Sequence, residues 1–303
     1  MPQDPRERVI AWLNRSGFPF EMRIAAALEQ AGFAVAQSVY YIDPESEDAR
    51  EADILASAES VTGEAFLRFT LVVECKARRD AGWVLFPRRG TPVDASTRVR
   101  MLTAPTLASP YLSRIARRAD VRALLAFGPR RPAYAMAQAK PVRERGQPRS
   151  AEDEEDDGKD HAYAAMMSVA KATSFLLSQV SQNDEDDEFE VLWPVIITES
   201  PLYEARLTGD GNVDLESVSE GTLSWRHPTA RGVLAIDVVH ASAAEEYIAK
   251  AKAAVDLLLY NTSQELSAVA AKRAARRRAA SEAQARAQAD ANVRSEAKAQ
   301  PRP

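Results

Sequence analysis

Cysteine and histidine are both scarce in this sequence. Its 303 residues include one cysteine, Cys75, and only three histidines. A single cysteine excludes a disulfide within the chain, and so few sulfur and imidazole ligands argue against a structural zinc site. Stability must therefore come from a packed hydrophobic core, which the 46% of hydrophobic residues can supply.

Long apolar runs are missing as well. No stretch contains the roughly 18 consecutive apolar residues that cross a bilayer, and the opening residues, MPQDPRERVIAWLNRSG, lack the apolar centre of a signal peptide. The glycine-rich motifs of P-loop proteins and dinucleotide-binding enzymes are absent, and so is the G-x-S-x-G motif of serine hydrolases. We therefore expect a cytoplasmic protein that makes no use of a membrane, of ATP or of a serine nucleophile.

Charges of opposite sign are segregated along the chain, although the net charge is only −5. Residues 82–149 are rich in arginine, whereas 151–160 and 184–188 are almost entirely acidic. Two interpretations are open for the basic stretch. It is either a nucleic-acid surface, because arginines contact phosphates and release counterions, or an arginine-rich surface that pairs with the acidic runs.

The last forty residues or so differ in composition from the rest. From about residue 264 the chain is rich in alanine and charge and poor in large apolar side chains, so this segment cannot build a core of its own. We expect residues 1–263 to form a single domain and 264–303 to form a helical or disordered tail. The cluster KRAARRR at 272–278 either binds nucleic acid or only keeps a helix soluble.

Hydrophobic periodicity predicts a mixed α/β fold. A helix over 19–31 is followed by Gly32, which suits a helix C-terminus. Three strands in antiparallel order come next, rich in β-branched and aromatic residues. The predicted strands are 33–43, 50–56, 65–78, 133–139, 189–200, 202–207, 213–219 and 233–241. The later predicted helices are 110–127, 161–180 and 243–260.

The segment LVVECKAR, residues 71–78, ends an apolar strand with two charges. Side chains alternate between the faces of a strand, so Glu74 and Lys76 share one face, which we expect to meet a cleft, and Cys75 points to the core. If strands 50–56 and 65–78 pair antiparallel, Asp53 meets Glu74 across the ladder. Glu21, in the first predicted helix, can approach the same place.

Two carboxylates on adjacent strands suit a hard divalent cation. Mg²⁺ takes oxygen ligands and keeps several of its waters, whereas two close carboxylates without a metal would repel each other. A lysine beside them can orient a water nucleophile or stabilise charge on a phosphate. The set Asp53, Glu74 and Lys76 therefore predicts a metal site that faces a phosphodiester. The alternative is a solvated Glu–Lys pair without a functional role, which would contribute little to the stability of the fold.

At these residues the chain resembles the PD-(D/E)xK nuclease superfamily, which has the restriction-endonuclease-like fold. The matching pattern is a helix with Glu21, a strand, READ with Asp53, and ECK with Glu74 and Lys76. The resemblance implies that Asp53 and Glu74 are metal ligands and that Lys76 is the catalytic lysine. It also implies the backbone carbonyl of Cys75 as a further ligand, Glu21 as a water-mediated ligand, and Mg²⁺ or Mn²⁺ as the cofactor.

The chain departs from the superfamily pattern in three places. Ala52, and not proline, precedes Asp53. The predicted helix 161–180 lacks a Gln-x-x-x-Tyr element, so the helicase-associated nuclease branch is not supported. The basic insertion 79–160 is not part of the minimal fold. The subfamily therefore stays open.

We expect an α/β protein with a restriction-endonuclease-like αβββαβ core, a long insertion and a C-terminal strand–helix extension. The expected function is magnesium-dependent hydrolysis of DNA, in host defence or DNA processing. One alternative is a catalytically inactive nuclease-fold module that binds nucleic acid or a partner protein. Another is a scaffold that assembles through its C-terminal helix and tail. A homodimer and an unidentified protein partner are both compatible with the sequence.

Overall fold

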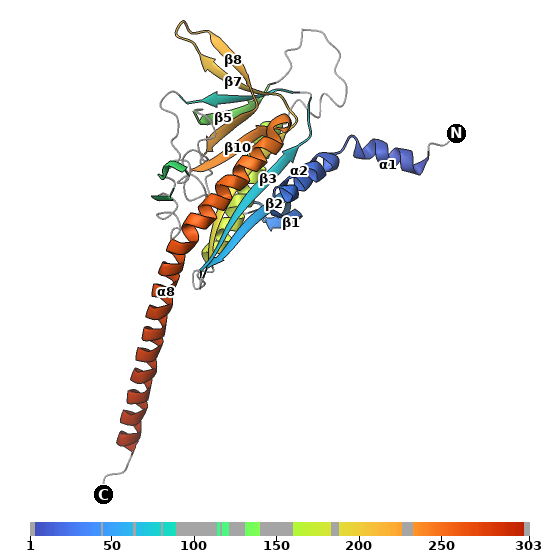
Figure 1. Ribbon diagram of the computed structural model, residues 1–303. Helices are drawn as coiled ribbons and strands as arrows, with labels where there is room; N and C mark the ends of the chain where they lie inside the picture. The colour runs from blue at the N-terminus through green and yellow to red at the C-terminus, as the bar shows by residue number, and fades with distance from the viewer. Residues whose placement is uncertain are drawn as a thin grey trace.

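The computed structural model describes residues 4–43, 45–62, 65–79, 81–88, 114–115, 117–120, 131–139, 160–182, 188–225 and 233–299. These residues form a mixed α/β structure around a ten-stranded sheet, as Figure 1 shows. The helices are α1 (Pro5–Leu13), α2 (Phe18–Gln30), α7 (His161–Gln182) and α8 (Ala244–Ala299), with a 3-10 turn at Ala241–Ala243. The strands are β1 (Ala34–Ile42), β2 (Ala49–Thr62), β3 (Ala65–Lys76), β4 (Trp83–Pro87), β5 (Ala133–Gln138), β6 (Glu188–Thr198), β7 (Leu202–Leu207), β8 (Val213–Val218), β9 (Glu220–Trp225) and β10 (Leu234–His240).

The predicted antiparallel meander of three strands is confirmed. Helix α2 ends where Gly32 adopts a φ of 90° and the Phe33 N–H donates to the Leu28 carbonyl at 3.1 Å, a helix end that favours glycine. The chain then enters β1, which pairs antiparallel with β2, and β2 pairs antiparallel with β3. Strand β2 is longer than the predicted 50–56, because its pairing with β3 continues as far as Thr62.

Parallel strands bring three strand ends to one edge of the sheet. The sheet order is β1-β2-β3-β6-β10-β9-β5-β4-β7-β8. Helix α7 connects back into β6, which runs parallel to β3 from Phe66↔Glu188 to Lys76↔Thr198. Strand β10 is in turn parallel to β6. The carboxyl ends of β3, β6 and β10 therefore lie side by side, with Lys76 at the first of them.

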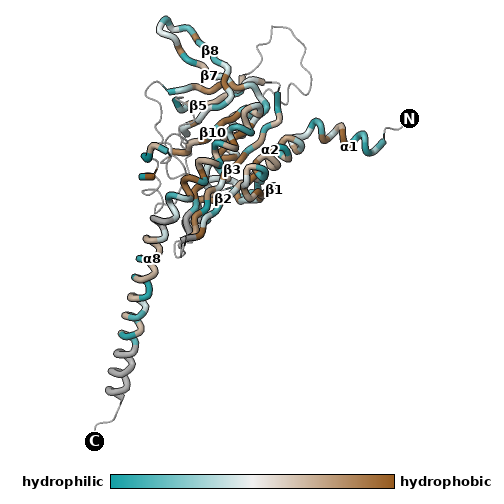
Figure 2. The backbone as a smooth tube through the Cα atoms, in the orientation of Figure 1, coloured by the Kyte–Doolittle hydropathy of each residue, from teal (hydrophilic) through white to brown (hydrophobic). Residues whose placement is uncertain are grey.

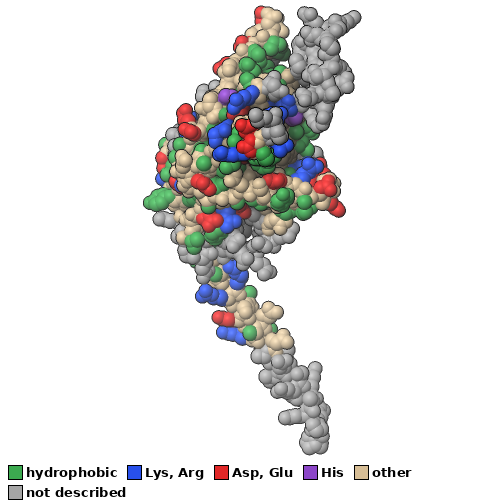
Figure 3. Space-filling model, turned by 90° about the vertical axis from the view of Figure 1, so that its right-hand side faces the viewer, with side chains coloured by type: hydrophobic (Ala, Val, Ile, Leu, Met, Phe, Trp, Pro, Cys, Tyr) green, Lys and Arg blue, Asp and Glu red, His purple; other side chains and the backbone are tan. Residues whose placement is uncertain are grey.

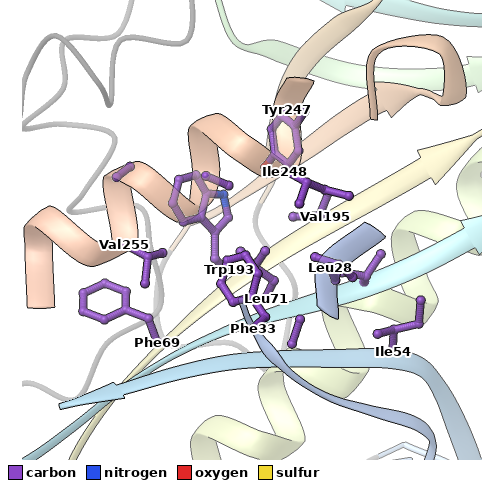
Figure 4. Close-up of a cluster of buried hydrophobic side chains, with 14 of the residues drawn as sticks. Leu28, Phe33, Ile54, Phe69, Leu71, Trp193, Val195, Tyr247, Ile248 and Val255 are labelled. Atoms are coloured by element: carbon purple, nitrogen blue, oxygen red, sulfur yellow. The ribbon is translucent and has the colours of Figure 1, made fainter. Parts of the chain in front are cut away.

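Two hydrophobic clusters cover the two faces of the sheet. Helices α2 and α8 pack on one face, where Phe69 and Trp193 are each 1% exposed; Figure 4 shows this cluster, with Tyr247 and Val255 reaching it from α8. Helix α7 packs on the other face, against residues such as Val72 and Ile196. Each large apolar side chain buried in this way contributes roughly 1.5–3 kcal/mol. Strand β6 is buried on both faces, from residue 191 to 198.

Helix α8 begins close to the predicted start at 243 and runs on to Ala299, well past the predicted end at 260. Ala270 is fully buried in the cluster under α2 and α8. Beyond it the helix leaves the sheet and projects from the body (Figure 1), and its hydropathy becomes mixed and largely polar (Figure 2). The segment from 264 is therefore helical as far as 299. None of the described helices is long and apolar enough to cross a membrane.

Strand β9, EGTLSW, was not predicted from the sequence. Its Gly221 suggests a turn, yet the strand pairs antiparallel with β10 from Val239↔Glu220 to Leu234↔Trp225. A Cβ atom at Gly221 would lie 2.3 Å from Leu85 Cδ1, so the glycine leaves room for the Leu85 side chain to pack over β9. Helix α1 was also not predicted. Most of the predicted helix 110–127 and most of the basic stretch 82–149 lie outside the described residues.

Candidate active site at the end of the β2–β3 ladder

Asp53 lies one residue beyond the last pair between β2 and β3, at a position that the pairing between β2 and β1 skips. The pairing with β3 ends at Ile54↔Val73, and the pairing with β1 passes from Gln37↔Ile54 to Val39↔Ala52. Between them Ser38 has a φ of 54°, a left-handed conformation that few residues other than glycine adopt. The Asp53 carboxylate is thus placed at the end of the β2–β3 ladder, where β2 no longer pairs with β3.

The Asp53 side chain accepts a hydrogen bond from β3 in place of a backbone carbonyl of β2. Its Oδ2 accepts a hydrogen bond of 2.7 Å from the backbone N–H of Cys75. The N–H and C=O groups of one strand residue face the same neighbouring strand, so the Cys75 carbonyl also points toward the gap beside Asp53. The Cys75 side chain lies in the core under α2 and α8, as predicted, and burial raises the pKa of its thiol well above the usual value.

Glu74 and Lys76 share one face of β3, as predicted, but this face is not an open cleft at Glu74. Helix α7 covers Glu74, which is only 4% exposed. Lys76 Nζ donates to Glu74 Oε1 at 2.5 Å, and Ser168 Oγ, on α7, donates to Glu74 Oε2 at 2.8 Å. Glu74 is covered because β3 runs on beneath helix α7. Lys76, two positions further along the strand, is therefore the member of the pair nearer to solvent.

The carboxyl groups at this place outnumber the one ammonium group, and burial raises their pKa values. Burial, opposed by the nearby Lys76 ammonium, raises the pKa of Glu74 to about 7. Burial also raises the pKa of Asp53, again against the influence of Lys76. Burial alone would lower the pKa of Lys76, but the neighbouring Glu74 and Asp53 carboxylates raise it on balance. One ammonium therefore compensates these buried carboxylates incompletely.

Glu21 belongs to the same electrostatic group. Partial burial raises the pKa of the Glu21 carboxyl, the nearby Asp53 raises it further, and Lys76 opposes both. The side chain starts from the first turn of α2, close to Gly17, whose Cβ would lie 3.0 Å from Glu21 Oε1. The structure thus brings Glu21, Asp53, Glu74 and Lys76 together, from two strands and one helix.

Sequence reasoning missed Ser168, which holds the second oxygen of Glu74. Lys171 follows three positions later on α7 and is tied to the turn after β1, donating to Asp43 at 2.9 Å and pairing with Glu45 at 2.7 Å. Lys171 therefore holds α7 to the turn after β1 through these two carboxylates, and its ammonium group is not merely solvated. Ser168 and Lys171 share a helix face because they are three positions apart, but only the tertiary contact identifies the serine.

The donor set fits Mg²⁺ or Mn²⁺ in part. Mg²⁺ is commonly bound by one or two carboxylates, with water and substrate phosphate completing six oxygen ligands. Asp53, Glu74 and the Cys75 carbonyl would supply such a set, and a bound cation would relieve the surplus of negative charge. In the part of the chain that the structure describes, no three His, Cys, Asp or Glu side chains form a group that could hold a metal ion by themselves.

Comparisons with known proteins do not identify a function, so the functional assignment rests on the site itself. No family model, no curated protein and no solved structure matches the chain.

Proposed function

We propose that this protein is a metal-dependent nuclease of the restriction-endonuclease-like fold that hydrolyses DNA phosphodiester bonds. The observation that carries the proposal is the meeting of Asp53, Glu74 and Lys76 at the break between β2 and β3. The order of elements supports it: helix α2, the meander β1–β3, helix α7 and the parallel strand β6 follow the αβββαβ order of that fold. Buried carboxylates with raised pKa values beside a lysine are typical of functional sites.

In this proposal Asp53, Glu74 and the Cys75 carbonyl hold Mg²⁺ or Mn²⁺. When bound, the ion supplies Lewis acidity, which activates water and offsets negative charge on the phosphate. Ser168 fixes the orientation of the Glu74 carboxylate through its hydrogen bond of 2.8 Å.

Lys76 provides the positive charge that the reaction needs at neutral pH. Its neighbours Glu74 and Asp53 raise its pKa, so the ammonium stays protonated. Its side chain is 29% exposed, whereas that of Glu74 is 6% exposed, so Lys76 is the group of the pair that solvent and substrate can reach. From there it orients the attacking water or donates to a phosphate oxygen as negative charge develops.

The second candidate is a nuclease-fold module that binds nucleic acid without cutting it. One specific observation favours it: both oxygens of Glu74 already accept hydrogen bonds, from Lys76 and from Ser168. A glutamate that keeps both partners has less capacity for a cation. The nuclease requires that Mg²⁺ displaces Lys76 from Glu74, so that the glutamate can bind the ion. The binding module does not require this displacement.

The test is cleavage of supercoiled, linear and single-stranded DNA by wild type and Lys76→Ala, each with Mg²⁺, Mn²⁺ or EDTA. We expect cutting that needs metal and falls by about 100-fold or more in the variant, the usual cost of losing one transition-state donor. Lys250→Ala is the matched control, because Lys250 forms an exposed ion pair with Glu246 on α8. Cutting that survives Lys76→Ala would refute the site. Salt-dependent binding without cutting by wild type would favour the binding module.

A further inference from the structure

Two arginines converge on one carboxylate beside Lys76. Glu199 follows β6 directly, and its Oε1 accepts from Arg23 Nη2 at 3.2 Å and from Arg79 Nη2 at 2.7 Å. Its Oε2 accepts from Arg79 Nε at 3.1 Å. The arginines come from different elements, Arg23 from α2 and Arg79 from the segment after β3. We call these three residues the Glu199 clamp.

The clamp stands at the same edge of the sheet as the candidate active site. The Glu199 N–H donates to the Lys76 carbonyl at 2.9 Å, so the clamp is joined through the backbone to the lysine. Arg23 is two positions from Glu21 on α2, and Arg79 is three positions beyond Lys76. On the face of the molecule in Figure 3, Lys and Arg side chains gather around acidic ones in the upper part.

The segment that carries Arg79 is held in place by side-chain hydrogen bonds. Thr198 Oγ1 donates to the Lys76 carbonyl at 3.2 Å, and Ser200 Oγ donates to the Arg78 carbonyl at 2.8 Å. Thr198 and Ser200 are fully buried. The residues that directly follow β3 and β6 are therefore joined to each other, and the hydrogen bonds to Glu199 orient the Arg79 guanidinium. This preorganisation reduces the entropy that binding would otherwise cost.

The clamp retains positive charge and hydrogen-bond donors for a ligand. Two guanidinium groups share one carboxylate, which leaves a net charge of about +1. The side chains of Arg23 and Arg79 are 59% and 74% exposed, whereas that of Glu199 is 12% exposed. Among the described residues, no acceptor other than Glu199 pairs with either guanidinium. Exposed arginine pairs contribute little to stability, so stability alone does not account for the convergence.

We infer that the Glu199 clamp binds a backbone phosphate of the nucleic acid next to the phosphodiester at Lys76. Arginine is suited to this because its planar fork pairs with two phosphate oxygens. Glu199 holds the two guanidinium groups close together, because both donate to its Oε1. This inference rests on the proposed function for its substrate class, and it adds the residues that position the substrate backbone.

The test measures the salt dependence of DNA binding. A fluorescein-labelled DNA duplex is titrated by fluorescence anisotropy in Mg²⁺ at several salt concentrations, in a Lys76→Ala background so that the duplex is not cut. Arg23→Ala and Arg79→Ala are added singly and together. Neutralisation of one phosphate contributes about 0.9 to the slope of log affinity against log salt, so we expect a decrease of about 0.9 when both arginines are removed and a smaller decrease for each alone.

Arg68→Ala is the matched control. Arg68 pairs with Glu59 at 2.8 Å and lies 5.0 Å from the Phe66 ring, much as Arg23 pairs with Glu199 and lies 5.6 Å from the Phe20 ring. It stands at the hairpin end of β2 and β3, away from Lys76. We expect Arg68→Ala to leave the slope unchanged. Arg79→Lys should keep the slope, because the charge remains, and weaken the affinity, because lysine has no planar fork.

Two outcomes would overturn the inference. One is slopes for Arg23→Ala and Arg79→Ala that match that of Arg68→Ala, whether unchanged or equally lowered, and the other is no binding of DNA by the parent protein. The two proposals fail separately. Cleavage by wild type together with arginine-independent binding would remove the clamp and leave the nuclease. Arginine-dependent binding without any cleavage by wild type would remove the nuclease and leave the clamp.

Discussion

Asp53 accepts a hydrogen bond from the backbone N–H of Cys75 at the point where β2 and β3 stop pairing. A side chain thus replaces a ladder hydrogen bond, and the same carboxylate stands beside Lys76 and Glu74. Asp53 therefore has a structural role and, in the proposed nuclease, a chemical role as well. Two substitutions distinguish these roles.

Asp53→Asn should abolish metal-dependent cleavage without destabilising the fold. The amide oxygen of asparagine can still accept from Cys75, and the substitution removes a charge whose burial raises the pKa of Asp53. Asp53→Ala should abolish cleavage and also lower the free energy of unfolding by about 1–3 kcal/mol, because the Cys75 N–H loses a charged acceptor. Denaturant unfolding and DNA cleavage measure both effects. Equal stability of the two variants would show that the hydrogen bond contributes nothing.

Ser168→Ala should reduce cleavage by roughly tenfold, because Glu74 Oε2 loses the donor that orients it, and partners of metal ligands typically contribute 10- to 100-fold. The effect should appear as a higher Mg²⁺ requirement. Ser178→Ala is the control on the same helix, since Ser178 Oγ donates only to the Phe175 carbonyl of its own helix. A Ser168→Ala variant with wild-type Mg²⁺ dependence would contradict the role of the serine.

The metal-free protein should lose stability as the pH rises. Burial raises the pKa of Glu74 from 4.5 to about 7, so the folded state binds the proton more tightly than the unfolded chain. The corresponding stabilisation is complete below pH 4.5 and is lost as the pH rises through 7. The decrease amounts to up to about 3 kcal/mol, at about 1.4 kcal/mol per pKa unit. The raised pKa of Asp53 acts in the same direction.

Urea unfolding in EDTA between pH 5 and 8.5 checks this expectation. Glu74→Gln should show a flatter profile, because glutamine does not titrate. Mg²⁺ should stabilise wild type at pH 8, since a ligand that binds only the folded state raises its stability, and should stabilise Glu74→Gln much less. A wild-type profile that does not fall between pH 5 and 8.5 would contradict the raised pKa of Glu74.

Truncation of α8 separates its packed part from its projecting part. Removing residues after 271 should leave stability unchanged within about 0.5 kcal/mol, because residues 275–288 are all exposed. Removing residues after 263 should cost about 1 kcal/mol or more, because Ala270 is fully buried in the core. We also expect an unchanged number of chains per assembly in solution, since the projecting part has few large apolar side chains to bury in an interface. A lower oligomeric mass after either truncation would support the scaffold hypothesis.

The predictions that succeeded were those that depend on local pattern. Alternation along LVVECKAR was enough to put Glu74 and Lys76 on one face of β3 and Cys75 on the other, because side-chain direction in a strand repeats every two residues. The antiparallel meander and the start of α8 followed from the same local signals. Strand β9 was missed because Gly221, typical of a turn, is needed there for the close approach of Leu85.

The sequence by itself determined which residues are acidic and basic, and on which face of each strand they lie. Only the tertiary structure decided that α7 covers Glu74, that Ser168 reaches its second oxygen, and that Arg23, Arg79 and Glu199 converge beside Lys76. The physical reason is one of range. Backbone geometry fixes side-chain direction within a few residues, whereas these hydrogen bonds join residues between 94 and 176 positions apart. Their meeting depends on the order of strands in the sheet and on the packing of both faces.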